Sequence, residues 1–357
     1  MSVLESIALQ ISKKLIDVLS SKRLPKPSHW DSDALSAHLV EVANWSDRIE
    51  FFGFGRARHT DSDSIGLSTA LPRKLQKWHT RADKYSEREL LTATGHYLLL
   101  GDPGAGKTTT LKRLVRTFLQ QSPLSDADQI QYPIVVRLRE LDAAQWLEEA
   151  LCRAVGLKYE RRTLETSGQT QQPEMSGKTQ QHDTKPSIQA YVGDVPCLDA
   201  VSEIIDSTKA LVVLDGMDEI NPALRERTET TIKDLARKTV TARILVSCRS
   251  GDYNHIIPGF DTLEICALTS EQIAEVANRW CEHPSEFLQR LEKLPFSDLA
   301  TRPLFLCELI VLFETRGFIP SQPAGVYRRI VLLALEEWDR QKPDSVQRQS
   351  RYSQFDP

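Results

Sequence analysis

The sequence predicts an α/β protein with a parallel sheet flanked by helices. Its strands are short apolar runs, and the first of them ends at Gly101, another at Asp215 and a third at Arg249. Strands that are buried on both faces of a parallel sheet have such continuous apolar runs. Between the runs, apolar residues recur at helical spacing, as at Leu111, Leu114, Val115 and Phe118. Strands that alternate with helices in this way indicate crossover connections and one central sheet.

The turn after the first strand predicts the binding of a nucleotide phosphate. Residues 101–108, GDPGAGKT, match the phosphate-loop pattern G-x-x-x-x-G-K-[ST] in full. Glycines allow the backbone to curl so that several N–H groups face one point, and the following helix adds its positive end. Lys107 is expected to contact the β- and γ-phosphates, and the Thr108 hydroxyl to bind Mg²⁺. The predicted phosphate-binding residues are Gly101, Asp102, Pro103, Gly104, Ala105, Gly106, Lys107, Thr108 and Thr109. The fold class is therefore that of a P-loop NTPase.

Charged residues at the ends of two later strands complete this predicted site. Asp215 ends the strand 211–215, so it lies near the phosphate loop in a parallel sheet and is expected to hold Mg²⁺ through water. Asp218 and Glu219 follow on the next turn, where either could orient or deprotonate the attacking water. Arg249 ends the strand 243–249 and can reach the edge of the γ-phosphate. We predict Asp218, Glu219 and Arg249 as catalytic residues, and Thr108 and Asp215 as metal ligands.

Composition argues against several other classes of function. With 45 Lys and Arg against 49 Asp and Glu, the formal net charge is −4, which does not indicate a nucleic-acid partner. The six cysteines form no C-x-x-C pair, and their spacing with the eight histidines is not that of a metal site. No signal peptide or membrane-spanning run is evident, so a cytoplasmic protein is expected.

Residues 1–90 are expected to form a mainly helical region. Apolar residues have helical spacing over 2–20, and a second helix is expected over about 31–44. A strand or hairpin edge is expected at 49–55, and another helix after Leu71-Pro72. His59, Asp61 and Asp63 resemble metal ligands but are interpreted as a polar loop. The first helix favours packing on its own domain over membrane binding, because its polar face carries both charges. A packing or adaptor role is favoured over an enzymatic one for the whole region.

A polar insertion interrupts the predicted nucleotide domain at about 158–196. Gln, Thr, Ser, Gly and Lys dominate it, with almost no apolar residue before Ile188. Such a segment buries too little apolar surface to offset the entropy of ordering, so we expect it to be disordered and dispensable. A lid that folds over the site is the alternative.

Four segments together resemble a NACHT-type NTPase module, of the class of signal-transduction ATPases with numerous domains. They are Leu214–Glu219 (LDGMDE), Ser247–Arg249 (SCR), Leu268–Ile273 (LTSEQI) and Thr301–Leu304 (TRPL). The resemblance covers about 91–340. It implies a nucleotide-binding domain at 91–265 and a small helical domain at 266–342, with helices at 270–281, 285–294, 304–315 and 325–340. It also implies that Arg249 senses the γ-phosphate and that Pro303 packs against adenine. Residues 343–357 are then the start of a winged-helix region that the chain does not complete.

The resemblance implies a slow ATPase that acts as a switch, with ATP or ADP and Mg²⁺ bound and self-association on activation by an unknown trigger. Immune or anti-phage defence is the setting that it implies. ATP is favoured over GTP because no Asn-Lys-x-Asp motif occurs. Two alternatives stay open: a nucleotide-locked interaction scaffold without turnover, and a motor of the AAA+ type. Gly216 argues against the motor, because AAA+ proteins place Glu directly after the metal-binding Asp.

Overall fold

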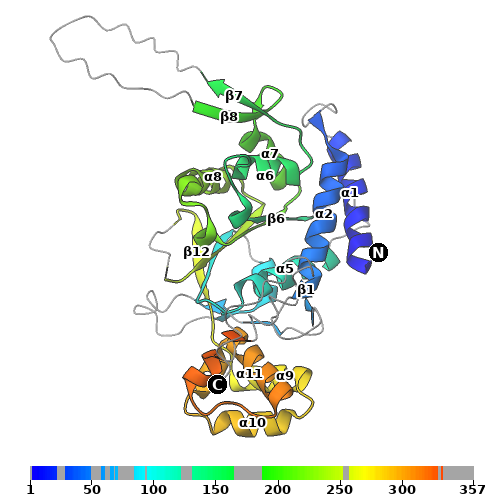
Figure 1. Cartoon of the computed structure of the whole chain (residues 1–357). Helices are drawn as coiled ribbons and strands as arrows, with labels where there is room; N and C mark the ends of the chain where they lie inside the picture. Colours follow the sequence, from blue (N-terminus) through cyan, green and yellow to red (C-terminus); the bar gives the residue numbers. More distant parts are fainter. Residues whose placement is uncertain are drawn as a thin grey trace, which may run out of the picture.

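A central parallel sheet organises the molecule (Figure 1). The computed structural model describes residues 2–21, 29–49, 58–60, 65–67, 69–70, 84–92, 95–121, 131–164, 187–251, 257–328 and 331–332. Two N-terminal helices lie along one side of the sheet, a β-hairpin projects from one end, and a helical domain lies at the opposite end (Figure 1).

The sheet has seven strands in the order β4-β3-β12-β5-β11-β10-β6. Five of them are parallel: β5 (His96–Gly101), β6 (Pro133–Arg137), β10 (Leu211–Asp215), β11 (Arg243–Arg249) and β12 (Phe260–Ile265). The predicted α/β class is confirmed. The antiparallel strands β3 (Thr69–Ala70) and β4 (Lys84–Tyr85) extend the sheet beyond β12.

Strand order decides which residues meet at the carboxyl edge. β11 lies between β5 and β10, so the strand with Asp215 does not pair directly with the strand before the phosphate loop. In register, Arg249 is opposite Gly101, and Val246 is opposite Leu214. The ends of β5, β11 and β10 therefore adjoin, with the end of β11 between the other two.

Helices cover the sheet with their apolar faces. α5 (Lys107–Gln121) buries the four predicted positions, Leu111, Leu114, Val115 and Phe118. The other covering helices are α4 (Glu87–Thr92), α6 (Leu147–Ala154), α7 (Cys197–Ser207) and α8 (Arg225–Lys238). Single 3₁₀ turns occur at Leu138–Glu140, Met217–Glu219 and Pro222–Leu224.

The N-terminal helices belong to the same hydrophobic core as the sheet. α1 (Val3–Ser21) and α2 (Ser32–Asp47) confirm both predicted helices, and the Asp31 side chain caps α2 by accepting from the Ala34 N–H at 3.0 Å. α2 packs on α5, α6 and β6, and its Leu35, Leu39 and Val42 are buried. β3 and β4 also precede residue 90, and they pair in the central sheet. The N-terminal region therefore packs together with the nucleotide domain across the boundary that we predicted at residue 90. Of the predicted strand 49–55, Ile49 lies in β1 (Arg48–Ile49), which pairs with β2 (Arg58–His59). Residues 50–57 and the helix expected after Leu71 lie outside the described residues.

His38 of α2 covers the outer edge of the sheet. The Val135 N–H of β6, the last strand in the order, donates to His38 Nε2 at 3.4 Å, so this nitrogen must be unprotonated. Burial, with the charge of Arg137 nearby, lowers the pKa of His38 to about 4.

This geometry predicts that the contribution of His38 to stability is lost in mild acid. Because the pKa of His38 is lower in the folded chain than in the unfolded one, the unfolded chain binds more protons. The contribution of His38 is complete above about pH 6.5 and falls toward pH 4, by about 2 kcal/mol between about pH 7 and pH 5. Glu308 acts in the opposite direction, since burial raises its pKa to about 7. We therefore expect the unfolding free energy of wild type minus that of His38→Gln to fall by about 2 kcal/mol from pH 7 to pH 5 in denaturant titrations, because Glu308 contributes equally to both proteins. Parallel curves for the two proteins would contradict this role.

The polar insertion is ordered at both ends, which corrects the prediction of disorder over 158–196. β7 (Glu160–Leu164), β8 (Ser187–Val192) and β9 (Val195–Pro196) form an antiparallel sheet. The few apolar residues suffice because Ala190 and Val192 are buried and β8 contacts α7. Residues 165–186, where we expected disorder, lie outside the described residues.

The helical domain follows β12 and confirms three predicted helices. They are α9 (Ser270–Trp280), α10 (Pro284–Glu292) and α11 (Pro303–Arg316), with a 3₁₀ turn at Ser297–Thr301 before α11. Thr269 and Gln272 form a reciprocal cap at the start of α9. Phe287 and Phe313 meet edge to face at 5.5 Å between α10 and α11. A further helical stretch covers 323–328, and most of the predicted helix 325–340 lies outside the described residues. Within those described, no helix has the length and apolar character needed to cross a membrane.

Candidate nucleotide-binding site

The loop between β5 and α5 has the backbone shape that its glycines require. Gly104 and Gly106 have φ values of +77° and +94°, in the region that side chains with a Cβ rarely adopt. The Ala105 N–H donates to the Asp102 carbonyl at 3.0 Å, and the Thr110 N–H donates to the Gly106 carbonyl at 2.8 Å. The loop thus turns tightly and leads directly into the first turn of α5.

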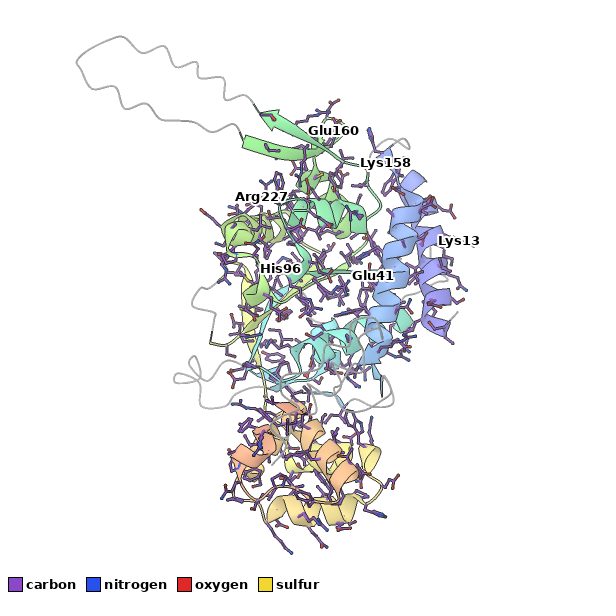
Figure 2. The ribbon with its side chains drawn as sticks, in the orientation of Figure 1. Lys13, Glu41, His96, Lys158, Glu160 and Arg227 are labelled. Carbon is purple, nitrogen blue, oxygen red and sulfur yellow. The ribbon has the colours of Figure 1, made fainter. Side chains whose placement is uncertain are left out.

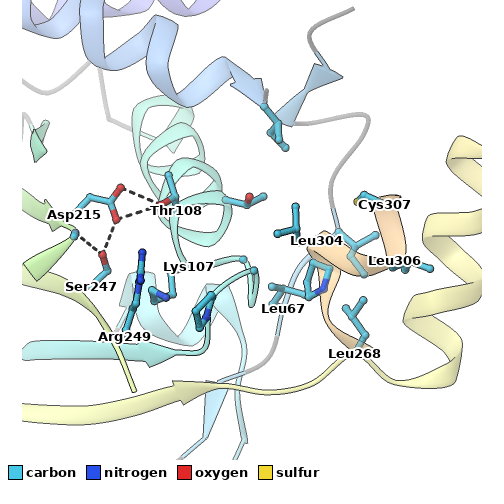
Figure 3. Close-up of a pocket in the computed structure, with 18 of the residues that line it drawn as sticks. Leu67, Lys107, Thr108, Asp215, Ser247, Arg249, Leu268, Leu304, Leu306 and Cys307 are labelled. Carbon is cyan, nitrogen blue, oxygen red and sulfur yellow. Dashed lines mark hydrogen bonds between the residues drawn. The ribbon is translucent and has the colours of Figure 1, made fainter. Parts of the chain in front are cut away.

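Thr108 and Asp215, the two predicted metal ligands, are in contact. The Thr108 hydroxyl lies 3.1 Å from Asp215 Oδ2. Ser247 of β11 joins them, because its hydroxyl donates to Asp215 Oδ1 at 2.6 Å and accepts from the Gly216 N–H at 2.8 Å (Figure 3). A wholly buried serine therefore fixes the carboxylate that faces Thr108.

The two acids after Asp215 are held differently by Arg249. Asp218 accepts from the Arg249 backbone N–H at 3.0 Å and from its Nε at 2.8 Å, and only 5% of the Asp218 side chain is exposed. Glu219 is 40% exposed, and its oxygens lie 3.9 Å from Arg249 and 3.7 Å from Arg139. Asp218 is thus fixed at both oxygens, whereas Glu219 has only long contacts.

Lys107 lies among these groups at the start of α5. Its ammonium donates to the Gly101 carbonyl at 2.7 Å. Burial lowers the pKa of Lys107. The charges of Asp218 and Asp215 oppose this shift, and the charge of Arg249 adds to it. The site combines three cations and three acids, a composition suited to a charged ligand with a metal ion.

A cavity of about 330 Å³ joins this polar cluster to an apolar wall. Figure 3 shows Thr108, Lys107, Asp215, Ser247 and Arg249 on one side, and Leu67, Leu268, Leu304, Leu306 and Cys307 on the other. The apolar wall also includes Ile49, Ile65, Val276, Trp280 and Pro303. It is therefore built from the N-terminal region, α9 with the segment that leads into it, and α11.

The structure brings most of the predicted site residues to this cavity. Its lining includes Pro103, Gly104, Gly106, Lys107, Thr108, Thr109, Asp215, Asp218, Glu219, Arg249 and Pro303. Gly101, Asp102 and Ala105 belong to the same loop but do not line the cavity. The described residues contain no group of three or more His, Cys, Asp or Glu placed to hold a metal, and Asp61 and Asp63 lie outside them.

Sequence reasoning missed several residues of the site. Ser247 could have been noticed, since it lies two positions before Arg249 on the same strand and so faces the same side. Arg139 follows the end of β6, where the sequence contains none of the motifs that we used. Ile49, Ile65 and Leu67 gave no local signal, because only the folded chain brings them to the cavity.

Comparison with known proteins places this site in a family. A family model described as the NACHT domain matches residues 96–284, more than half of the 357-residue chain. The chain belongs to the NACHT domain family. The match begins at β5 and ends at the start of α10, so Ile49, Ile65, Leu67 and all residues of α11 that line the cavity lie outside the matched segment. The wall of the cavity therefore extends beyond the matched NACHT segment on both sides.

Three solved structures resemble the chain at low identity. A signal transduction ATPase with numerous domains from Pyrococcus horikoshii, which carries a tetratricopeptide repeat sensor, is 12% identical, with a TM-score of 0.38 over 76% of this chain. The Orc1 protein of Aeropyrum pernix in complex with DNA is 17% identical, with a TM-score of 0.38 over 71%. A Walker-type ATPase of Pyrococcus abyssi is 14% identical, with a TM-score of 0.37 over 72%. The chain spans 34%, 62% and 74% of these proteins, respectively. No curated protein matches it.

The position of Ser247 in this NACHT domain predicts a defect in metal use. Ser247→Ala removes the donor to Asp215 and leaves the buried Gly216 N–H without its acceptor, at a cost of about 1–3 kcal/mol of stability. We expect Mg²⁺ to increase the affinity for nucleotide less in this variant than in wild type, as measured by calorimetry with and without the metal. Ser250→Ala, which removes a hydroxyl bonded to Glu264 instead, is the control. An unchanged effect of Mg²⁺ would argue against this role of Ser247.

Proposed function

We propose that this chain is an ATP-binding and slowly hydrolysing switch of the NACHT type, in which nucleotide state controls the arrangement of domains and self-association. The observation that carries the proposal is the shared cavity: its polar end belongs to the sheet, and α9 and α11 of the helical domain supply much of its apolar wall. A ligand that touches two domains can favour one arrangement of them over another. Family membership alone leads us to propose immune or anti-phage defence as its setting, and the cytoplasm remains its expected location.

The residues at the polar end fit a nucleotide with Mg²⁺. The positive-φ glycines allow the tight turn of the loop into α5, and Lys107 supplies a charge beside it. Thr108 and Asp215, in mutual contact, would hold the metal, and Arg249 the edge of the last phosphate. A bound Mg²⁺ would neutralise phosphate charge. The apolar end would receive the base, with Pro303 and Trp280 in its wall; our preference for ATP over GTP rests on the sequence alone.

The different contacts of the two acids support a division of their roles. A carboxylate that orients a water needs a free oxygen, and Asp218 uses both of its oxygens on Arg249. Glu219 is more exposed and has only long contacts. We therefore assign the water to Glu219, and to Asp218 the positioning of Arg249.

Phosphate release from ATP tests this proposal. Wild type should turn over slowly, Glu219→Gln should bind ATP but lose turnover about 100-fold or more, and Asp218→Asn should lose both turnover and some affinity for ATP. Equal turnover in wild type and Glu219→Gln would refute the assignment. No turnover in any of the three proteins would favour the nucleotide-locked scaffold.

Molar mass in solution tests the switch itself. The Glu219→Gln protein with ATP should form larger assemblies than wild type with ADP in light scattering after size-exclusion chromatography. The same mass in both nucleotide states would contradict control of self-association.

A further inference from the structure

The start of α11 contacts the phosphate loop directly, next to the cavity. Arg302, the residue before the helix, places Nη2 3.1 Å from Asp102 Oδ2. Two residues later, the Leu304 N–H donates to the Gly104 carbonyl at 3.2 Å. Asp102 belongs to the phosphate loop but does not line the cavity.

Packing at Gly104 depends on the same contact. A Cβ built on Gly104 would lie 2.8 Å from Leu304 Cβ, closer than two such atoms can approach. Gly104 therefore serves two purposes, since it gives the loop its positive φ and makes room for Leu304. The shape of the loop and the position of α11 are fitted to each other.

The contact is firmly attached to the body of the helical domain. The Leu268 N–H donates to the Thr301 carbonyl at 2.8 Å, and the Arg302 carbonyl accepts from the Leu306 N–H at 3.0 Å. Leu306 is fully buried in the core. A displacement of Arg302 from the loop would therefore move α11 with it.

We propose that Arg302 is a positioning residue of the nucleotide site, which keeps the helical domain docked on the phosphate loop through Asp102 and so makes nucleotide affinity depend on that docking. The inference rests on the proposed nucleotide binding and specifies how the switch is coupled. Coupling is reciprocal: if docking shapes the loop that holds phosphate, bound phosphate must change the strength of docking by the same factor. Because both side chains are about half exposed, the ion pair alone contributes a several-fold change in affinity rather than an all-or-none effect.

Charge reversal at Arg302 tests the coupling. Arg302→Glu turns the attraction to Asp102 into repulsion, and Arg279→Glu makes the same change at an arginine of α9 that pairs with Glu275. Calorimetry should give ADP affinity that is about fivefold or more weaker for Arg302→Glu than for Arg279→Glu. Asp102→Asn should weaken binding too, and adding it to Arg302→Glu should cost less than it does in wild type, since the repulsion is then removed.

Amide hydrogen exchange separates undocking from unfolding. In Arg302→Glu, exchange at the Leu304 amide should become faster, while α9 and α10 keep the protection that they have in Arg279→Glu. Equal ADP affinity in the two variants would overturn the proposal, as would weaker binding with undiminished protection of Leu304. Failure of wild type to bind ADP would instead refute the proposed function.

Discussion

Replacing Lys107 by Ala is expected to abolish nucleotide binding, with a loss of affinity for ATP of about 100-fold or more. The Lys107 ammonium lies at the turn of the loop and donates to two carbonyls, that of Gly101 at 2.7 Å and that of Asp102 at 3.4 Å. Carbonyl partners do not neutralise its charge, which is therefore available to a phosphate. The substitution removes a positive charge from a partly buried site, where electrostatic attraction to phosphate is stronger than in water. Isothermal calorimetry with ATP and with ADP measures the effect.

Lys112→Ala is the matched control for that experiment. Lys112 lies on the same helix, and its ammonium donates to the Arg48 carbonyl at 2.6 Å, away from the phosphate loop. This variant should bind ATP like wild type. If Lys107→Ala also bound ATP with unchanged affinity while remaining folded by circular dichroism, the assignment of residues 101–108 as the phosphate site would be wrong.

The parts of the site that the sequence predicted are those with local causes. The loop could be predicted because positive φ angles require glycine at 104 and 106, and both angles are present. Asp215 and Arg249 could be predicted because parallel strands bring their carboxyl ends to one edge. Each inference needed only a few consecutive residues.

The parts that could not be predicted depend on contacts distant in the sequence. Leu67 reaches Gly106 and Arg302 reaches Asp102 only after three separate regions have packed together. The order of the sheet has the same origin, since nothing in the sequence of β11 says that it inserts between β5 and β10. The site is therefore predictable in its chemistry and much less so in its walls.

The ordered hairpin shows why composition misled us at the insertion. We expected disorder because the segment has few apolar residues, but Arg161 of β7 is held mainly by polar contacts. It donates to the Glu149 carboxylate of α6 at 2.5 and 2.7 Å and to the Ala144 carbonyl at 2.9 Å. It also stacks on Trp146, with the guanidinium 4.1 Å from the ring, and Arg227 contacts the same ring at 3.5 Å. Figure 2 shows Arg227 near the base of the hairpin that carries Glu160. A charged segment is thus anchored to the nucleotide domain.

Arg161→Ala should therefore destabilise the protein strongly, by about 3–5 kcal/mol. The Glu149 side chain is completely buried, so its charge loses its partner where water cannot replace it. Arg162→Ala, at the next residue of β7, is the matched control: its partner Glu160 is 60% exposed, and the expected loss is below about 1 kcal/mol. Denaturant unfolding of both variants at neutral pH measures the difference.

A second substitution distinguishes two causes of the expected destabilisation: the unpaired charge of Glu149 and the loss of packing on Trp146. Glu149→Gln in the Arg161→Ala background removes the unpaired charge but keeps a side-chain oxygen, which can still accept from the Trp146 backbone N–H as the Glu149 carboxylate does at 2.9 Å. If the buried charge causes most of the loss, the double variant must be more stable than Arg161→Ala alone, because a neutral amide costs far less to bury than a carboxylate. If the double variant is no more stable, the hairpin is held chiefly by the stacking of Arg161 on Trp146, and the anchoring role of Glu149 is refuted.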